Sequence, residues 1–420
     1  MKILWITNTL LPPLAEICGK NIIGSGGWMY ASLQALQQQD PTLQFAVATM
    51  GGKGINLKEE INGITYYLLP FEINPKTYNS SMEVAWRKVR DDFQPNVIHI
   101  HGSEYIQGLA YIRGCSNKHV VLSIQGIISV IQRYITGGLT PHDAWDNLTL
   151  KEFFKAELRR MPEHNQKRTN IEIAYFKEIQ HVIGRTSWDK CHTLSVNPKL
   201  NYHFCNETLR DAFEGHKWSP YSCERHSIFI SQGMSPLKGM HKIIEALPFI
   251  LRYYPNAQVY VAGKNITSVT SLKELFKLSA YANYLRHLIR KFDVSKHIHF
   301  CGILTAEQMA QRYLNSNVFV CPSSIENSPN SLGEAQLLGV PCVSSFVGGV
   351  PDFVEDGKTG LLYRFEETEM MADCICRIFA NDQFAIQLSN EEQKVASVRH
   401  NKKNNALETI KIYSEIANEK

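Results

Sequence analysis

Short β-rich runs alternate with helix-length stretches along most of this sequence, and that alternation leaves few folds open. The stretch from Gly27 to Gln39 is long enough for a helix and carries Met29, Leu33 and Leu36 on one face. β-rich runs that alternate with helices predict a parallel sheet with helices on both of its faces. In the first half of the chain the runs are Ile3–Ile6, Phe45–Ala48, Val97–Ile100, Val120–Ser123 and His181–Gly184.

The second half repeats this scheme. An apolar stripe at i, i+3, i+4 and i+7 predicts an amphipathic helix from Met240 to Leu251. One long helix is expected around Leu272 to Lys291, and Thr305 with Gln308 three residues later forms a capping box that opens another. The β-rich runs are Ser227–Ile230, Val259–Gly263, Ile298–Cys301, Val318–Cys321 and Cys342–Ser345.

A chain of 420 residues has room for two or three domains, and the pattern favours two. Residues 206–225 lack a clear period and are predicted to be a linker between an N-terminal domain (1–205) and a C-terminal domain (226–385). Residues 386–420 form a helical segment that is a candidate to pack back towards the N-terminal domain. The expected fold class is α/β, with two Rossmann-like domains whose parallel sheets face each other across a ligand-binding cleft.

Composition excludes several classes of protein. With 44 Lys+Arg against 40 Asp+Glu, a net charge of +4 does not indicate a nucleic-acid binder. The ten cysteines form no CxxC pair, so we expect reduced thiols in a cytosolic protein and no zinc site. The start, Met1 to Asn8, is interpreted as a buried strand and not as a signal peptide.

Any membrane contact is expected to be peripheral, because no run approaches the ~18 apolar residues that would span a bilayer. The basic residues between Lys151 and Arg168 are interleaved with glutamates, which favours a solvated helix face over a membrane-docking face. For the basic residues between Lys273 and Lys291, a solvated helix face is likewise favoured over a membrane-docking face.

The most informative stretch runs from Pro322 to Pro341, through a polar loop into a short helix. Asn330 or Ser331 can cap that helix, and its first amides, from Asn330 to Leu332, suit a phosphate group. Glu326 and Glu334 flank this position, and carboxylates accept hydrogen bonds from hydroxyl groups. An anion site beside two hydroxyl acceptors fits a nucleotide joined to a sugar.

This stretch resembles the retaining group 1 glycosyltransferases, which have the GT-B fold. Their Glu-x7-Glu motif is matched by Glu326 and Glu334, and the similarity continues through residues 335–341, 347–352 and 356–362. The resemblance implies sugar transfer from a nucleotide-diphosphate sugar, with retention at the anomeric carbon and with neither a metal nor a cofactor. It also implies that Glu334 binds the ribose and that Glu326 addresses the transferred sugar.

Lys238-Gly239 resembles the family's Lys-Gly motif, whose lysine binds the donor diphosphate. The family usually pairs this lysine with an arginine, and here that position is Gln232, which carries no charge. The departure indicates either a weaker diphosphate site or another residue that supplies the charge.

Two positions in the first half also resemble the family. Gly26 and Gly27 belong to Gly24-Ser25-Gly26-Gly27, at the place of the family's glycine-rich turn, where backbone amides approach a ligand; taken alone, these residues favour the alternative of a flexible surface turn. The strand Val97–Ile100 continues into His101, which resembles the histidine that reaches the donor sugar, whereas a satisfied histidine at a strand end is the alternative. The His99-x-His101 pair has no third ligand in view, so we expect no metal.

Gln125 and Arg185 follow two further strands and are weaker candidates. Gln125 stands where many relatives have histidine. Arg185 is a candidate either to replace the charge missing at Gln232 or to bind a phosphorylated acceptor, because guanidinium groups bind phosphate by paired hydrogen bonds.

The expected function is therefore transfer of a sugar to a saccharide or lipid-linked acceptor, in surface polysaccharide or glycoconjugate biosynthesis. The expected location is the cytoplasm or the inner face of the membrane. Two alternatives stay open: a non-catalytic subunit that binds nucleotide sugars, and another GT-B enzyme such as a nucleotide-sugar epimerase. A phosphorylase would need a lysine placed for pyridoxal phosphate, for which we find no motif.

Overall fold

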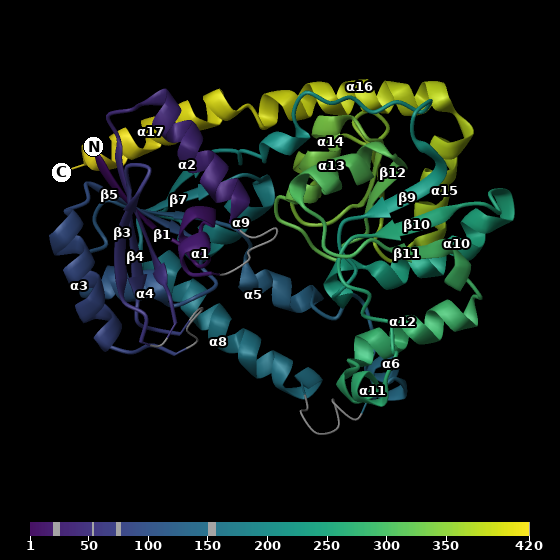
Figure 1. Ribbon diagram of the computed structural model, residues 1–420, viewed down its shortest axis with the longest axis horizontal. Coiled ribbons are helices and arrows are strands. Elements are labelled where there is room, and N and C mark those ends of the chain that lie inside the picture. Colours follow the sequence, from purple (N-terminus) through teal and green to yellow (C-terminus); the bar gives the residue numbers. More distant parts are fainter. Residues whose placement is uncertain (20–25, 53, 73–76, 150–156, 420) are drawn as a thin grey trace. The chain divides into compact units, whose positions relative to one another are not determined.

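A computed structural model describes residues 1–420 except 20–25, 53, 73–76, 150–156 and 420 (Figure 1). Contacts divide the chain into two compact units. Unit 1 comprises residues 1–130, 163–210 and 399–420, and unit 2 comprises residues 131–162 and 211–398. Residues 131–162, which the sequence assigned to the first domain, thus group with the second.

Unit 1 is built on an eight-stranded sheet with the order β3-β4-β2-β1-β5-β6-β7-β8. All neighbouring strands pair in parallel except β3 and β4, an antiparallel pair that the sequence analysis did not predict. The strands are β1 (Lys2–Ile6), β2 (Gln44–Met50), β3 (Leu57–Ile61), β4 (Ile64–Leu69), β5 (Val97–His101), β6 (Val120–Ser123), β7 (His181–Gly184) and β8 (Asn201–Phe204).

Helices cover both faces of this sheet, as alternating side chains require. Ile3 and Trp5 of β1 join one buried cluster with α1, α2 and α17, whereas Leu4 and Ile6 join another with α3, α4 and α8. The helices of unit 1 are α1 (Pro12–Ile17), α2 (Gly27–Gln39), α3 (Ser81–Phe93), α4 (Gln107–Gly114), α9 (Ser187–Val196) and α17 (Lys402–Ala417), and α5 (Ile128–Ile131) and α8 (Glu157–Glu178) cross its boundary.

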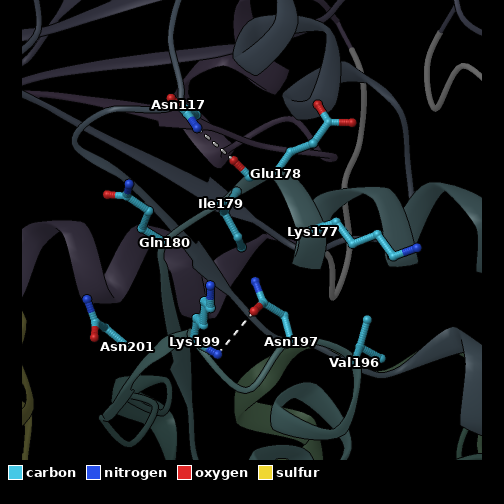
Figure 2. A pocket seen from close by; sticks show the side chains of 9 residues that line it. All are labelled: Asn117, Lys177, Glu178, Ile179, Gln180, Val196, Asn197, Lys199 and Asn201. Carbon is cyan, nitrogen blue, oxygen red and sulfur yellow. Dashed lines mark hydrogen bonds between the residues drawn. The ribbon is translucent and has the colours of Figure 1, made fainter.

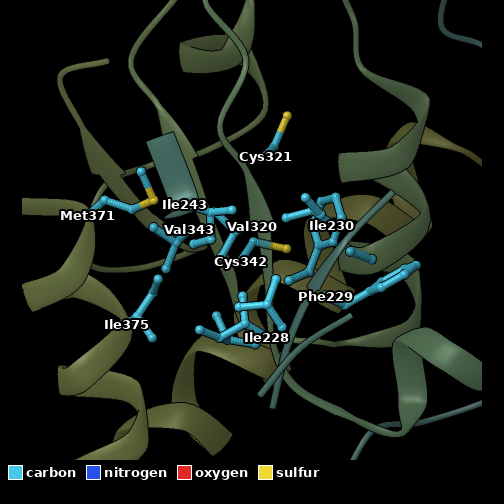
Figure 3. Close-up of a cluster of buried hydrophobic side chains, with 14 of the residues drawn as sticks. Ile228, Phe229, Ile230, Ile243, Val320, Cys321, Cys342, Val343, Met371 and Ile375 are labelled. Atoms are coloured by element: carbon cyan, nitrogen blue, oxygen red, sulfur yellow. The ribbon is translucent and has the colours of Figure 1, made fainter. Parts of the chain in front are cut away.

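Unit 2 has a six-stranded parallel sheet with the order β11-β10-β9-β12-β13-β14. Its central strands are apolar on both faces, and their side chains join Met371 and Ile375 of a neighbouring helix in one core (Figure 3). The strands are β9 (Glu224–Ile230), β10 (Gln258–Val261), β11 (Ile298–Phe300), β12 (Ser316–Cys321), β13 (Cys342–Ser345) and β14 (Leu361–Tyr363). The helices are α6 (Pro141–Asp146), α10 (Met240–Tyr253), α11 (Leu272–Lys277), α12 (Ala280–Lys291), α13 (Ala306–Leu314), α14 (Asn330–Leu338) and α15 (Thr368–Ala380), and α16 (Asp382–Arg399) crosses into unit 1 at its last residue.

The parallel α/β class predicted from the sequence is confirmed for both units, but the prediction of one helix was wrong. The stretch from Leu272 to Lys291 is two helices, because Leu278 is extended and the Ser279 side chain caps a new helix by accepting from the Ala282 amide. The capping box of Thr305 and Gln308 is present as predicted.

In the part of the chain that the structure describes, none of the helices combines the length and the apolarity needed to cross a bilayer.

Candidate functional site

Three loops at the carboxyl end of the second sheet converge on Glu326. The Lys238 ammonium, from the loop after β9, lies 2.6 Å from Oε1 of Glu326. The Ser323 hydroxyl donates to the same oxygen at 2.6 Å, and the Gly349 amide after β13 donates to the Glu326 carbonyl at 3.0 Å. The structure therefore brings together two of the predicted donor-site residues, Lys238 and Glu326, which are 88 positions apart.

Lys238 keeps its charge in this setting. Burial by itself would lower the pKa of its ammonium, but the attraction of Glu326 and their hydrogen bond outweigh burial and raise it. An ammonium group has three N–H donors. Within the described contacts one of them binds Glu326, which leaves two for the oxygens of an anionic ligand.

The turn that carries Lys238 is held tightly against the end of β12. Gly239 has φ +70°, and a Cβ placed on it would lie 1.7 Å from the Pro322 carbonyl oxygen. The Ser324 amide donates to the Leu237 carbonyl at 2.8 Å and joins the same two loops. Only glycine permits both this left-handed conformation and this approach.

Gly239→Ala is expected to destabilise the protein by clearly more than the ~1 kcal/mol of left-handed strain, because the Pro322 backbone must also move. Urea unfolding measures the loss. Gly357→Ala is the matched control, since Gly357 has φ +76° but has no atom within 4 Å of its added Cβ. Equal losses of unfolding free energy in the two variants would show that the contact with the Pro322 backbone does not require glycine at position 239.

Helix α14 starts differently from the prediction. Its N-cap is Pro329, with no side-chain cap, so neither Asn330 nor Ser331 has the predicted capping role. The Leu332 amide already donates to the Pro329 carbonyl at 3.0 Å. Of the three predicted amide donors, those of Asn330 and Ser331 are therefore the better candidates for an anion.

Glu334 is buried on α14 and is positioned by Tyr313 of α13, a residue that the sequence analysis missed. The Tyr313 hydroxyl lies 3.4 Å from Oε2 of Glu334 and donates to the Ser331 carbonyl at 2.9 Å. One hydroxyl thus contacts both the second glutamate and the first turn of α14.

Gln232 is exposed after β9, and the described contacts join it to neither Lys238 nor Glu326. Three exposed apolar side chains, Met234, Ile303 and Phe346, also follow carboxyl ends of strands in this sheet. These too escaped the sequence analysis, because isolated apolar residues in loops show no period.

In unit 1, His101 ends β5 as predicted. Its ring is 95 % buried, stacks on His99 with centroids 3.9 Å apart and lies 4.3 Å from the Trp5 ring. Neither ring nitrogen has a hydrogen-bond partner in the described structure. Burial, and then the neighbouring charges of His99 and Arg185, hold the pKa of His101 well below its ordinary value, so the ring is neutral and offers one donor and one acceptor.

His99 differs from His101, because both of its ring nitrogens are engaged, by the hydroxyls of Tyr413 (2.5 Å) and Ser123 (2.6 Å). A structural role for His99 follows. Among the residues that the structure describes, no three His, Cys, Asp or Glu side chains are grouped to hold a metal ion.

The glycine turn lies next to His101. Gly26 is the N-cap of α2 at φ +75°, and Trp28, two residues later, has its ring 6.3 Å from that of His101. Gly24 and Ser25, which completed the predicted motif, lie outside the described residues, as do Lys151 and Lys155.

Arg185 is paired in a way that the sequence did not reveal. Its Nη2 lies 2.5 Å from Glu207, and both side chains are about 95 % buried. When the oxygen and nitrogen of the Gln125 side-chain amide are exchanged so that both find partners, the amide nitrogen donates to Glu207 and the amide oxygen accepts from Arg185, each at 3.3 Å. The Arg185 charge is thus neutralised within unit 1, which argues against its predicted roles as a substitute for the missing cation and as a phosphate ligand.

Another acidic residue that the sequence analysis missed lies close by. Glu104 follows β5, and its Oε2 is buried without a hydrogen-bond partner among the described residues. Burial raises the pKa of its carboxyl to about 7.

A hollow of about 550 Å³ lies elsewhere, near the amino ends of β7 and β8 (Figure 2). None of the candidate residues lines it. Its walls are mainly amide and amine side chains, from Asn117, Lys177, Glu178, Ile179, Gln180, Val196, Asn197, Lys199 and Asn201.

Comparison with known proteins gives a family match for unit 2. Residues 222–395 match the family model described as "Glycosyl transferases group 1". "Spore coat protein SA" of Bacillus subtilis is 26 % identical over 166 residues, which are 39 % of this chain and 42 % of that protein. A "GDP-mannose-dependent alpha-(1-6)-phosphatidylinositol monomannoside mannosyltransferase" of Mycobacterium tuberculosis is 24 % identical over 172 residues, 39 % of this chain and 41 % of that protein. The matched part thus spans about two fifths of each relative.

Solved structures extend the likeness of the fold to nearly the whole chain. Sucrose-phosphate synthase from Thermosynechococcus elongatus superposes with a TM-score of 0.74 and 16 % identity, over 99 % of both chains. Anabaena Alr3699/HepE, solved with UDP and glucose, gives a TM-score of 0.64 and 15 % identity over 99 % of this chain and 100 % of that one. These likenesses confirm the predicted GT-B fold.

Proposed function

We propose, from the match of residues 222–395 to the family model of group 1 glycosyltransferases, that this chain transfers a sugar from a nucleotide-diphosphate sugar to a saccharide or lipid-linked acceptor. The observation that carries the proposal is the convergence of Lys238, Glu326 and Ser323 at the carboxyl end of the second sheet. Open α/β sheets bind their ligands at this end.

The chemistry of the group fits such a donor. The two N–H donors of Lys238 that Glu326 leaves available suit diphosphate oxygens, and the start of α14 adds backbone amides for the same anion. Glu334 and Glu326 offer carboxylate oxygens to the hydroxyls of a ribose and of the transferred sugar. Stabilisation of the departing diphosphate by fixed donors would be the main contribution of this unit to catalysis.

We propose separate roles for residues of unit 1. A neutral His101 with two unpartnered ring nitrogens suits a hydrogen bond to a sugar hydroxyl. Gly26 and Gly27 form the start of α2, where their backbone amides would approach a ligand; Gly26 is also required by the turn itself, because an added Cβ would lie 2.9 Å from the Leu10 carbonyl oxygen. We further propose retention at the anomeric carbon, reaction without a metal, and a cytoplasmic location; the family resemblance supports these assignments.

A second candidate function is a non-catalytic subunit that binds nucleotide sugars. The exposed, uncharged Gln232 favours it, because the described contacts place no second positive charge beside Lys238 to help bind a diphosphate. Turnover separates the two: a binding subunit would bind donor but neither transfer nor hydrolyse it.

A screen of UDP- and GDP-sugars for thermal stabilisation tests donor binding. A ligand present at 100 times its Kd stabilises the native state by about 2.7 kcal/mol, so the correct donor is expected to raise Tm by several degrees. Lys238→Met should abolish the shift, whereas Lys242→Met is the matched control because Lys242 pairs with Glu245 one turn further on. If no nucleotide sugar shifted Tm, the proposal would fail.

A further inference from the structure

Helix α11 presents an apolar face to solvent. Leu272, Leu275 and Phe276 are 76, 46 and 57 % exposed, and their i, i+3, i+4 spacing places them on one side of the helix. Large apolar side chains grouped in this way on a surface mark an interaction site more often than single exposed ones do.

The core of unit 2 does not need this face. Leu278, directly after α11, is buried, and Tyr281, Leu285 and Leu288 of α12 supply the apolar contacts to the core. This arrangement follows from the break between the two helices at Leu278 and Ser279.

The backbone of α11 is nevertheless well fixed. Ser271 caps the helix by accepting from the Glu274 amide, and the Glu274 carboxylate accepts from the Thr270 amide at 2.7 Å. The Arg286 guanidinium of α12 also donates to the Thr267 carbonyl at 2.8 Å and ties down the preceding loop. The apolar face is thus held outward by a structured, capped helix.

Positive charge is concentrated in the stretch of chain that carries this face. Residues 264–291 contain six Lys or Arg and one acidic residue, Glu274, so the stretch carries 6 − 1 = +5. The whole chain carries +4, which leaves −1 for all the other residues together. The described side chains of Lys264, Lys277, Arg290 and Lys291 are exposed.

We propose that the α11 patch, defined as Leu272, Leu275, Phe276 and Lys277, docks on the surface of an anionic lipid bilayer. The apolar face would enter the boundary between headgroups and acyl chains, and Lys277 would contact lipid phosphates. A second copy of the chain is the less favoured occupant, because a symmetric contact would place two strongly basic stretches together. The inference does not depend on the transfer reaction, although such docking would bring the protein to a lipid-linked acceptor.

Vesicle flotation with the full chain tests this inference. The protein is expected to float with vesicles of 70 % phosphatidylcholine and 30 % phosphatidylglycerol, and to bind much less to pure phosphatidylcholine or in 1 M salt. Leu272→Ser/Phe276→Ser should reduce binding at least tenfold. Tyr221→Ser/Tyr253→Ser is the matched control and should bind normally, because these two tyrosines are 81 and 76 % exposed elsewhere in unit 2.

A second variant keeps the apolar face. Lys277→Glu should weaken the preference for anionic vesicles while its Tm stays unchanged. Absence of binding to either vesicle, or equal binding by the Leu272/Phe276 variant and the parent, would overturn the inference. Light scattering that shows a dimer of the parent protein, lost in Leu272→Ser/Phe276→Ser, would also overturn the inference, since the occupant would then be a second copy.

Donor-induced thermal stabilisation should be unaffected in all of these variants, which separates this test from that of the proposed function.

Discussion

Replacing Lys238 with methionine is expected to lower the rate of sugar transfer by about 10²–10³-fold, the range found when one preorganised electrostatic donor is removed from an active site. The lysine would meet the negative charge that develops on the departing diphosphate, and Gln232 cannot supply that charge. Steady-state kinetics with the donor found by thermal screening measures the loss in kcat/KM.

Stability must be followed in the same experiment, because Glu326 is only partly exposed and loses its cation in this variant. We expect Lys238→Met/Glu326→Gln to recover much of any lost stability while transfer stays abolished, since the double variant no longer holds an unpaired carboxylate. Lys242→Met, whose ion pair with Glu245 lies on the adjacent helix, should keep near-normal activity. Full activity of folded Lys238→Met would remove Lys238 from the mechanism.

Replacing Arg185 with methionine is expected to reduce the free energy of unfolding by about 3–5 kcal/mol, because it leaves the buried Glu207 carboxylate without its ion-pair partner. Arg185→Met/Glu207→Gln should restore most of this loss, since both charges are then gone. Urea unfolding, followed by circular dichroism, measures each variant.

The control for this prediction is a pair in the same unit with a similar distance but greater exposure. Arg113 and Glu178 lie 2.6 Å apart with side chains 39 and 32 % exposed, so Arg113→Met should cost less than about 1 kcal/mol. Similar losses for Arg113→Met and Arg185→Met would mean that burial does not set the strength of the Arg185–Glu207 pair.

Lys238, Glu326 and His101 were predicted from motifs that resemble the group 1 glycosyltransferases and that follow β-rich runs, because parallel sheets bind ligands at the carboxyl ends of their strands. The structure brings Lys238 and Glu326 into contact. Glu207 and Tyr313 were missed because nothing local distinguishes them: one lies in a stretch without a period, and the other lies on an amphipathic helix. Their roles arise from contacts with Arg185 and Glu334.

The parallel α/β class, most strands and the order of the motifs were predictable from the chain, because burial of alternate and 3.6-spaced residues leaves a periodic pattern in it. Three other features emerge only from the folded structure: the pairing of Lys238 with Glu326, the neutralisation of Arg185, and the grouping of residues 131–162 with unit 2. That structure also showed that α11 turns its apolar face to solvent. These features depend on which distant side chains fill the same volume, and a local period carries no information about partners that lie tens of residues away.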